Sequence, residues 1–404
     1  MIKSTAPDIM TSRERMMAAM RHGTPDRVPV SPDISNMIPC RLTNRPFWEI
    51  YIDKEPPLWK AYIDAVRYFG MDGWVVANTV EFQTAAPVKM DQQIIKGTDR
   101  WYVTRTYHTP DGDLQEVIAA PVADPPTPVE KMIKNFKNDF KKIRHIFSEV
   151  VSYDAELFHT IRKEIAEDAM LSSYVSVPGF QNFLGFFNGN LESLVFAYMD
   201  EPELFQELCE LHDKREMQKL DIYLDLKIDA ILTSGSGSVT LQSPDIWREL
   251  SLPSIKKITS RCKEAGVISG IHSCGFEKYL AITCAQETDL DYVNPLEVPP
   301  MGDCTISQIR EAVGQKLCLM GNLHTVNTML LGTVNDVRRE SLQAILDGGI
   351  NGNFILSTGD QPGRDTPDAN IFAMVDAAKE FGSYPLNLEA VNAEILRLSG
   401  HFKI

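Results

Sequence analysis

The chain has 404 residues, 44% hydrophobic and 24% charged, a composition typical of a soluble globular protein with a large core. Its net charge of -15 argues against a surface that binds nucleic acid or anionic membrane, where lysine and arginine would dominate. The first residues show no signal-peptide pattern, no run reaches the ~18 apolar residues of a membrane span, and seven scattered cysteines suggest no disulfide framework. We therefore expect a cytoplasmic protein.

The first expected helix begins at a capping-box pattern, TSRE from Thr11 to Glu14, in which the hydroxyl and the glutamate satisfy free backbone donors. Eight short apolar runs bounded by turn residues follow, and helical segments separate the later ones. Two of these segments open on similar patterns, Ser243-Pro244-Asp245 and Thr366-Pro367-Asp368. The eight runs are VPVSPDI (28–34), GWVVAN (73–78), YVSVP (174–178), AILTSG (230–235), VISGIHSC (267–274), YVNPLE (292–297), LCLMGNL (317–323) and FILSTGD (354–360).

Strands of this length that alternate with helices predict parallel βα units, and uniformly apolar strands fit a sheet covered on both faces. Eight of them predict one TIM (β/α)8 barrel, formed by a single domain over residues 1–404. An open, doubly wound sheet is the alternative.

Residues 86–165 do not fit a minimal barrel and predict an insertion between the second and third strands. Alternating apolar and polar residues around Asp111-Gly112 indicate a β-hairpin. The lysine-rich segment from Pro125 to Lys163 indicates a helical extension of the same insertion.

In a TIM barrel the active site lies where the strands end. The expected strand ends carry polar groups, namely Asp33, Asn78, Ser176, Ser234, His272 with Cys274, Glu297, Asn322 with His324, and Asp360. His272 and Cys274 are two residues apart, so both side chains point to one side of a strand and can reach the same zinc ion. In the alternative reading, Cys274 is a small buried hydrophobe and His272 a hydrogen-bonded core histidine.

The opening run RERMMAAMRHGTPDRVPV and the later run SPDIWRELSLPSIKKI resemble uroporphyrinogen decarboxylase-like proteins. The runs HSCG, DYVNPLE, LMGNLHTVNTMLLGT and GGINGNFILSTGDQPGRDTPDANI resemble the corrinoid-dependent methyltransferase branch of that superfamily. The resemblance covers nearly the whole chain and implies a TIM barrel. It also implies a catalytic zinc held by His272, Cys274 and a later cysteine.

This chain departs from the branch at that later position, which holds Asp360. We expect Asp360 to be the third zinc ligand, with Glu297 as the alternative; loss of the metal site is a further possibility. Asp360 could instead cap a helix or pair with Arg364, and Glu297 could instead bind substrate.

The resemblance implies transfer of a methyl group to or from the cobalt of a separate corrinoid protein, since the chain has no DxHxxG corrinoid motif. A carboxylate ligand makes zinc a harder Lewis acid than a thiolate does, so we expect a small methoxy substrate and an O-demethylase component. A thiol methyltransferase of the coenzyme M type, a decarboxylase-like enzyme and a barrel that only binds its ligand are the alternatives. The PxWxMRQAGR-type signature of the true decarboxylase is absent.

Six further residues are candidates at the site. Glu297, Asn322 and His324 are expected to be catalytic, and Phe180, Asn182 and Asn78 to bind substrate. The phenylalanines after the third strand could equally pack the insertion against the barrel. A homodimer is also compatible with the sequence.

Overall fold

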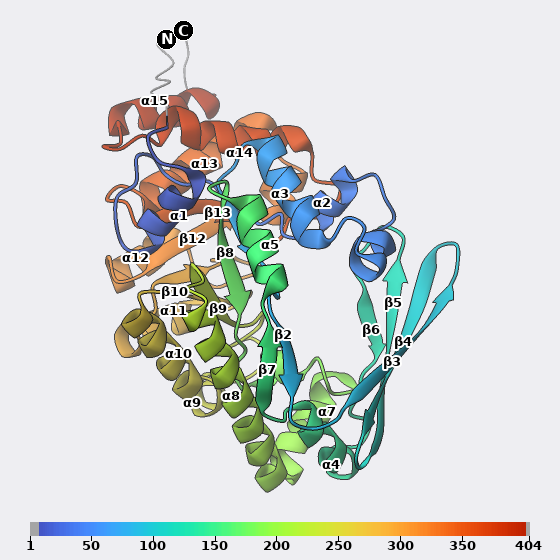
Figure 1. The fold of residues 1–404 in the computed structure, drawn as a ribbon. Helices are drawn as coiled ribbons and strands as arrows, with labels where there is room; N and C mark the ends of the chain where they lie inside the picture. Colours follow the sequence, from blue (N-terminus) through green and yellow to red (C-terminus); the bar gives the residue numbers. More distant parts are fainter. Residues whose placement is uncertain (1–7, 401–404) are drawn as a thin grey trace.

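The computed structural model describes residues 8–400 (Figure 1). At its centre is a curled parallel sheet of seven strands in the order β1-β8-β9-β10-β11-β12-β13, as in a TIM-like barrel. The strands are β1 (Gly73–Val76), β8 (Ala169–Tyr174), β9 (Ala230–Ser234), β10 (Ile268–His272), β11 (Tyr292–Asn294), β12 (Cys318–Leu323) and β13 (Phe354–Thr358).

Helices surround this sheet and separate its successive strands (Figure 1). Among residues 8–400, none of them combines the length and the apolar character needed to cross a membrane. The α-helices are α1 (Ser12–Met20), α2 (Met37–Leu42), α3 (Leu58–Phe69), α4 (Phe136–Ile146), α5 (Glu156–Ile165), α6 (Phe180–Phe183), α7 (Asn190–Asp200), α8 (Pro202–Asp225), α9 (Pro244–Leu250), α10 (Leu252–Ala265), α11 (Lys278–Glu287), α12 (Ile306–Val313), α13 (Val334–Gly348), α14 (Asp368–Phe381) and α15 (Leu388–Leu398), with π-helical segments η1 (Glu49–Asp53) and η2 (Thr325–Leu330).

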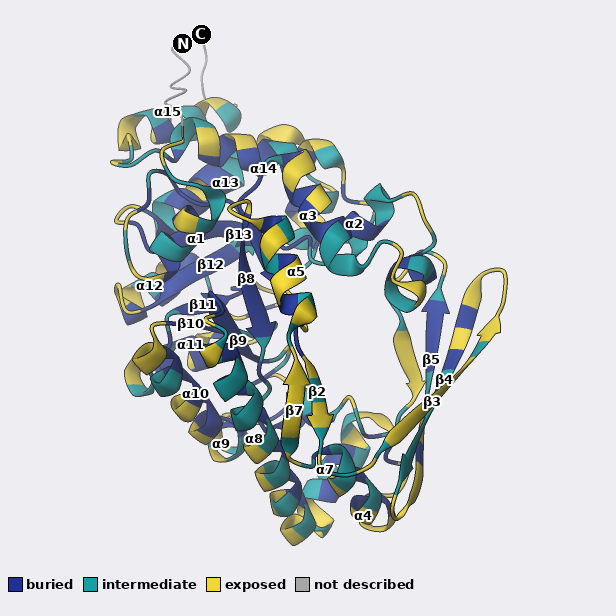
Figure 2. Cartoon of the chain, viewed as in Figure 1, coloured by how far each residue is buried: buried dark blue, intermediate teal, exposed yellow. Residues whose placement is uncertain are grey.

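The strands are buried on both faces, which explains their uniformly apolar sequences (Figure 2). Residues at the starts of the strands, among them Trp74, Tyr292 and Ile355, form one cluster with Met16 and Met20 of α1. Helix α1, whose capping box at Thr11 is present as predicted, therefore closes the amino-terminal end of the sheet. The carboxyl ends of the strands are left for the functional site.

The first of the eight expected strands forms only one parallel bridge in the structure, between Val30 and Leu356 of β13. Pro29 and Pro32 flank this segment and lack the N–H groups that a ladder needs. The backbone N–H of Asp72, just before β1, donates to the Val30 carbonyl oxygen at 2.8 Å. Residues around Val30 thus contact both edges of the seven-stranded sheet.

Three other expected elements are corrected. The third strand is Ala169–Tyr174 rather than 174–178, because its buried Ser172 and Ser173 interrupt the run of apolar residues that is typical of a buried strand. The single helix expected to open on Ser243-Pro244-Asp245 is divided at Ser251, two residues before Pro253, into α9 and α10. Helix α14 has Pro367 rather than Thr366 at its N-cap.

A second sheet lies between β1 and β8 in the sequence and away from the barrel strands in space (Figure 1). It is antiparallel, with β4 and β5 paired across a two-residue turn, Pro110-Asp111, one residue before the expected position at Asp111-Gly112. Its strands are β3 (Lys89–Lys96), β4 (Arg100–Thr109), β5 (Gly112–Pro121) and β6 (Thr127–Glu130). A separate antiparallel pair joins β2 (Glu81–Thr84) to β7 (Val150–Asp154).

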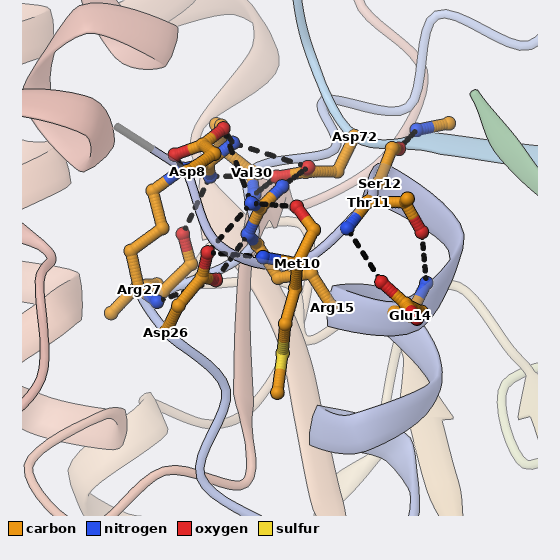
Figure 3. A network of polar contacts seen from close by, with 12 residues as sticks. Asp8, Met10, Thr11, Ser12, Glu14, Arg15, Asp26, Arg27, Val30 and Asp72 are labelled. Atoms are coloured by element: carbon orange, nitrogen blue, oxygen red, sulfur yellow. Dashed lines mark hydrogen bonds and ion pairs between the residues drawn. The ribbon is translucent and has the colours of Figure 1, made fainter. Parts of the chain in front are cut away.

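A buried ion network connects α1, the Val30 segment and the start of β1 (Figure 3). The Asp72 carboxylate accepts hydrogen bonds from Arg15 at 2.6 Å, from Arg27 at 2.8 Å and from the Val30 N–H at 2.9 Å. Arg15 is 1% exposed and Asp72 1% exposed. A charge buried this deeply is tolerated only because it is paired, so removal of Asp72 leaves Arg15 and Arg27 with fewer and less buried partners, Asp26 and Asp8.

We predict that Asp72→Asn lowers the free energy of unfolding by about 3–5 kcal/mol, because Arg15 and Arg27 would lose the one fully buried carboxylate that they share and keep only Asp26 and the exposed Asp8. Urea unfolding followed by circular dichroism measures this change. Asp64→Asn is the matched control, because Asp64 pairs with Lys60 on the exposed face of α3 and should contribute no more than about 1 kcal/mol. Equal losses for the two variants would contradict the assigned role of Asp72.

Candidate metal centre

The turn after β10 brings His272 and Cys274 together. His272 is the last residue of β10, and its register neighbour on β11 is Asn294. The chain then turns at Gly275, where φ is +96° and where a Cβ would lie 2.3 Å from the Thr240 hydroxyl oxygen. The Sγ atom of Cys274 lies 3.3 Å from Nε2 of His272.

Asn294 sets the orientation of the His272 ring. Its side-chain oxygen lies 2.9 Å from Nδ1 of His272, and an amide oxygen can only accept a hydrogen bond. Nδ1 therefore carries the proton, and the lone pair of Nε2 faces Cys274. In metal sites, one ring nitrogen of a histidine ligand usually donates a hydrogen bond of this kind, while the other nitrogen binds the metal. Here the nitrogen left for a metal is Nε2.

Asp360 follows β13 and completes a group with these two residues. The ligand atoms of His272, Cys274 and Asp360 all lie within 4.8 Å of one another, and all three side chains are half-buried. One Asp360 oxygen accepts the N–H of Gln361 at 2.7 Å. Glu297 is outside this group, and Arg364 pairs with Asp365 and Asp124 instead of Asp360.

The donor set fits a zinc ion. One imidazole nitrogen, one sulfur and one carboxylate oxygen are ligands that zinc accepts, and three protein ligands leave a coordination position open. Burial raises the pKa of the Cys274 thiol, and the negative charge of Asp360 raises it further. A divalent cation would have the opposite effect, because it favours the thiolate over the thiol.

Ser236 also contacts both members of the pair. Its hydroxyl lies 3.2 Å from Nε2 of His272 and 3.4 Å from Sγ of Cys274. Ser236 belongs to the exposed loop after β9. In the sequence, Ser236 lies in a run of glycines and serines after an expected strand, and nothing in that run distinguishes Ser236 from the neighbouring serines.

The three residues expected to be catalytic line one small hollow, of about 10 Å³, beside the carboxyl end of β12. The Glu297 carboxylate accepts the N–H of Gly275 at 2.6 Å, so it fixes the turn that follows Cys274. Burial raises the pKa of Glu297, and the charge of Asp360 adds to the rise. Asn322 and His324 are half-buried at the same hollow.

His324 also has a structural role that the sequence did not suggest. It is the N-cap of η2, and its Nδ1 accepts the N–H groups of Val326 and Asn327, each at 3.1 Å. Because Nδ1 acts as an acceptor, Nε2 carries the proton of the neutral ring. In this tautomer, Nε2 of His324 is a hydrogen-bond donor, while Nδ1 is occupied by the backbone of η2.

The residues expected to bind substrate do not lie together. Phe180 is 1% exposed and packs edge-on against Tyr198 and Phe205, so its assignment as a substrate contact is corrected to a packing role. Asn182 accepts a hydrogen bond from Tyr174 and donates to the carbonyl oxygens of Val177 and Ser234, and so joins the loop after β8 to β9.

Asn78 is exposed beyond the carboxyl end of β1. It lines a cavity of about 810 Å³ together with the rings of Tyr51, Trp59, Tyr62 and Trp74. The aromatic side chains that line a cavity are therefore those of η1, α3 and β1 rather than those of the phenylalanine loop.

Asp33, one of the polar residues at the expected strand ends, is buried among charged groups of the candidate site. It is 5% exposed, and its N–H donates to the Thr358 hydroxyl at the end of β13. Burial raises the pKa of Asp33, the cationic form of His272 opposes this, and the charge of Asp360 adds to it. Asp33 therefore belongs to the same electrostatic neighbourhood as the metal-ligand group.

Known proteins resemble the chain in sequence and in fold. Over 177 residues it is 29% identical to methylcobamide:CoM methyltransferase MtbA of Methanosarcina mazei, a match that covers 40% of this chain and 48% of that relative. The chain thus spans about half the length of the curated relative it matches. A solved methyltransferase from Methanosarcina mazei aligns with a TM-score of 0.64 and 18% identity, over 92% of this chain and 99% of the other, and supports the fold.

The sequence profile of uroporphyrinogen decarboxylase (URO-D) matches residues 122–381, from the last residues of the second sheet to the end of α14. This range holds all three members of the metal-ligand group. Because the match extends over well more than half of the chain, the protein belongs to the URO-D family.

Proposed function

We propose that the protein is a zinc-dependent methyltransferase that moves a methyl group between a small methoxy compound and the cobalt of a separate corrinoid protein. The observation that supports this proposal most directly is that the ligand atoms of His272, Cys274 and Asp360 all lie within 4.8 Å of one another. The partial likeness to a methylcobamide:CoM methyltransferase supports the corrinoid chemistry.

When bound by these three residues, zinc would supply a Lewis acid with an open position for a substrate oxygen or sulfur. The carboxylate of Asp360 is a harder donor than the thiolate implied by the family resemblance, which favours an oxygen ligand. Asn294 holds the His272 ring, and Glu297 holds the backbone at Gly275.

A corrinoid protein must reach the carboxyl ends of the strands for this transfer to occur. The half-buried state of the three ligand residues is compatible with such access. A thiol acceptor of the coenzyme M type is the second candidate, favoured by the name of the sequence relative. A decarboxylase-like reaction has the support of the family match alone.

We also propose that the chain forms one barrel domain over residues 1–404, with residues 86–165 as an insertion. The ends of that range, 1–7 and 401–404, lie outside the described residues. Support comes from the position of β3–β6 and α4 between β1 and β8 in the chain order. The Val30 segment would then act as the first strand of the barrel, through its contacts with β13 and Asp72.

The reaction can be tested with cob(I)alamin and a panel of methoxyarenes. We expect loss of the cob(I)alamin absorbance and formation of methylcob(III)alamin with at least one member of the panel. Asp360→Cys should retain the metal but shift reactivity from ethers to thiols, because it replaces the hard donor with a soft one. Absence of any absorbance change over a broad panel, with zinc bound, would rule out the demethylase proposal.

The metal can be tested independently of the reaction. We expect about one zinc ion at this centre, lost in Cys274→Ala but retained in Cys262→Ser, whose buried sulfur lies in α10 away from the group.

Asn294→Ala should weaken zinc binding at this centre by about 10–100-fold, because the His272 ring would lose its hydrogen-bond acceptor. Asn294→Asp should keep the affinity, because a carboxylate can also accept the Nδ1 proton. Elemental analysis and competition with a chromophoric chelator measure these values. If Cys274→Ala retains the same zinc content as the native chain, the assignment of this ligand is wrong.

A further inference from the structure

A second group of potential metal ligands lies outside the centre described above. It consists of Glu277, Asp303 and Cys304, whose ligand atoms all lie within 4.8 Å of one another. Glu277 immediately precedes α11, and the other two residues lie just before α12. The residues are distant in sequence, so the turn after β10 and the loop after β11 bring them together.

Backbone contacts hold each of these side chains in place. One oxygen of Glu277 accepts the N–H of Glu297 at 3.3 Å. One oxygen of Asp303 accepts the N–H of Lys278, in the first turn of α11, at 3.0 Å. The Cys304 thiol lies 3.9 Å from the carbonyl oxygen of Glu297. Contacts with backbone atoms, rather than ion pairs with one another, therefore bring these three side chains together.

The buried carboxyl of Glu277 lacks a partner of its own. The residue is 0% exposed, and its Oε1 has no hydrogen-bond partner among residues 8–400. A buried carboxylate oxygen without a partner is costly, and such groups in native proteins are usually paired or bound to a metal. Burial raises the pKa of Glu277 to about 9, and the charges of Glu297 and Asp303 add to the rise. A cation would reverse this rise and satisfy the free oxygen.

We propose that Glu277, Asp303 and Cys304 form a second site for a divalent, thiol-binding cation such as Zn²⁺. One sulfur and two carboxylate oxygens suit zinc better than magnesium or calcium, which prefer oxygen ligands alone. Asp303 is exposed and gives the cation a route from solvent, while Glu277 and Cys304 are buried. The cation would join the start of α11 to the segment before α12. This proposal does not depend on the proposed methyl transfer.

Co²⁺ is a suitable probe because a thiolate bound to it gives a charge-transfer absorption in the near ultraviolet. The first centre is removed by combining His272→Ala with Cys274→Ala. We expect the native chain to bind about two Co²⁺ ions and this double variant about one, which keeps a thiolate band. Adding Cys304→Ser should abolish the remaining band, whereas adding Cys262→Ser should not. A double variant that binds no Co²⁺, or whose band persists without Cys304, would overturn the proposal.

Asp303→Asn in the otherwise native chain provides a second test that does not disturb the core, because Asp303 is exposed. We expect its Co²⁺ content to fall from about two ions to about one, with the Cys274-dependent band retained. An unchanged metal content would contradict the proposal. The two centres can be told apart by these results. If only the first centre fails to bind Co²⁺, the absorption band that depends on Cys274 is missing and the band that depends on Cys304 is still present.

Discussion

The rest of the structure depends on the Asp72 carboxylate, which holds the Val30 segment beside the start of β1. The segment at Val30 carries prolines on both sides and makes a single bridge to β13, so backbone pairing alone holds it weakly. Asp72 compensates through its side chain, which accepts the Val30 N–H, and through its backbone, which donates to the Val30 carbonyl. Arg15 and Arg27 neutralise the charge that this arrangement buries.

The position of the Val30 segment has a consequence at the opposite end of the sheet. Three residues after Val30, the chain places Asp33 beside the end of β13, where its N–H donates to Thr358. Parallel strands bring all their carboxyl ends to one edge, so residues that follow β10, β11 and β13 meet there. Because of this geometry, His272 lies opposite Asn294, and Asp360 lies close to His272 and Cys274. The segment that the buried network holds thus leads directly to Asp33, at the carboxyl ends of the strands.

The sequence was sufficient to place the parallel βα architecture and the pair His272 and Cys274, because apolar runs and the spacing of two metal-binding residues are local signals. Asp360 could be placed because it ends an expected strand. Asn294 could not, since an asparagine at a strand end looks like an ordinary turn residue until its partner is known. Phe180 was assigned wrongly for a related reason. An aromatic side chain in a loop suits a pocket and a packed interior equally well, and only the contacts decide between them.

Glu297 links the two groups of ligands. Its carboxylate accepts the N–H of Gly275, next to Cys274, while its backbone N–H donates to Glu277 and its carbonyl oxygen faces Cys304. A Cβ at Gly302 would lie 2.1 Å from that same carbonyl oxygen, so the loop can fold back on Glu297 only with glycine at this position. The loop before α12 and the turn that carries Cys274 therefore both contact Glu297. The two ligand groups come from different loops, and Glu297 is the residue that touches the backbone of both.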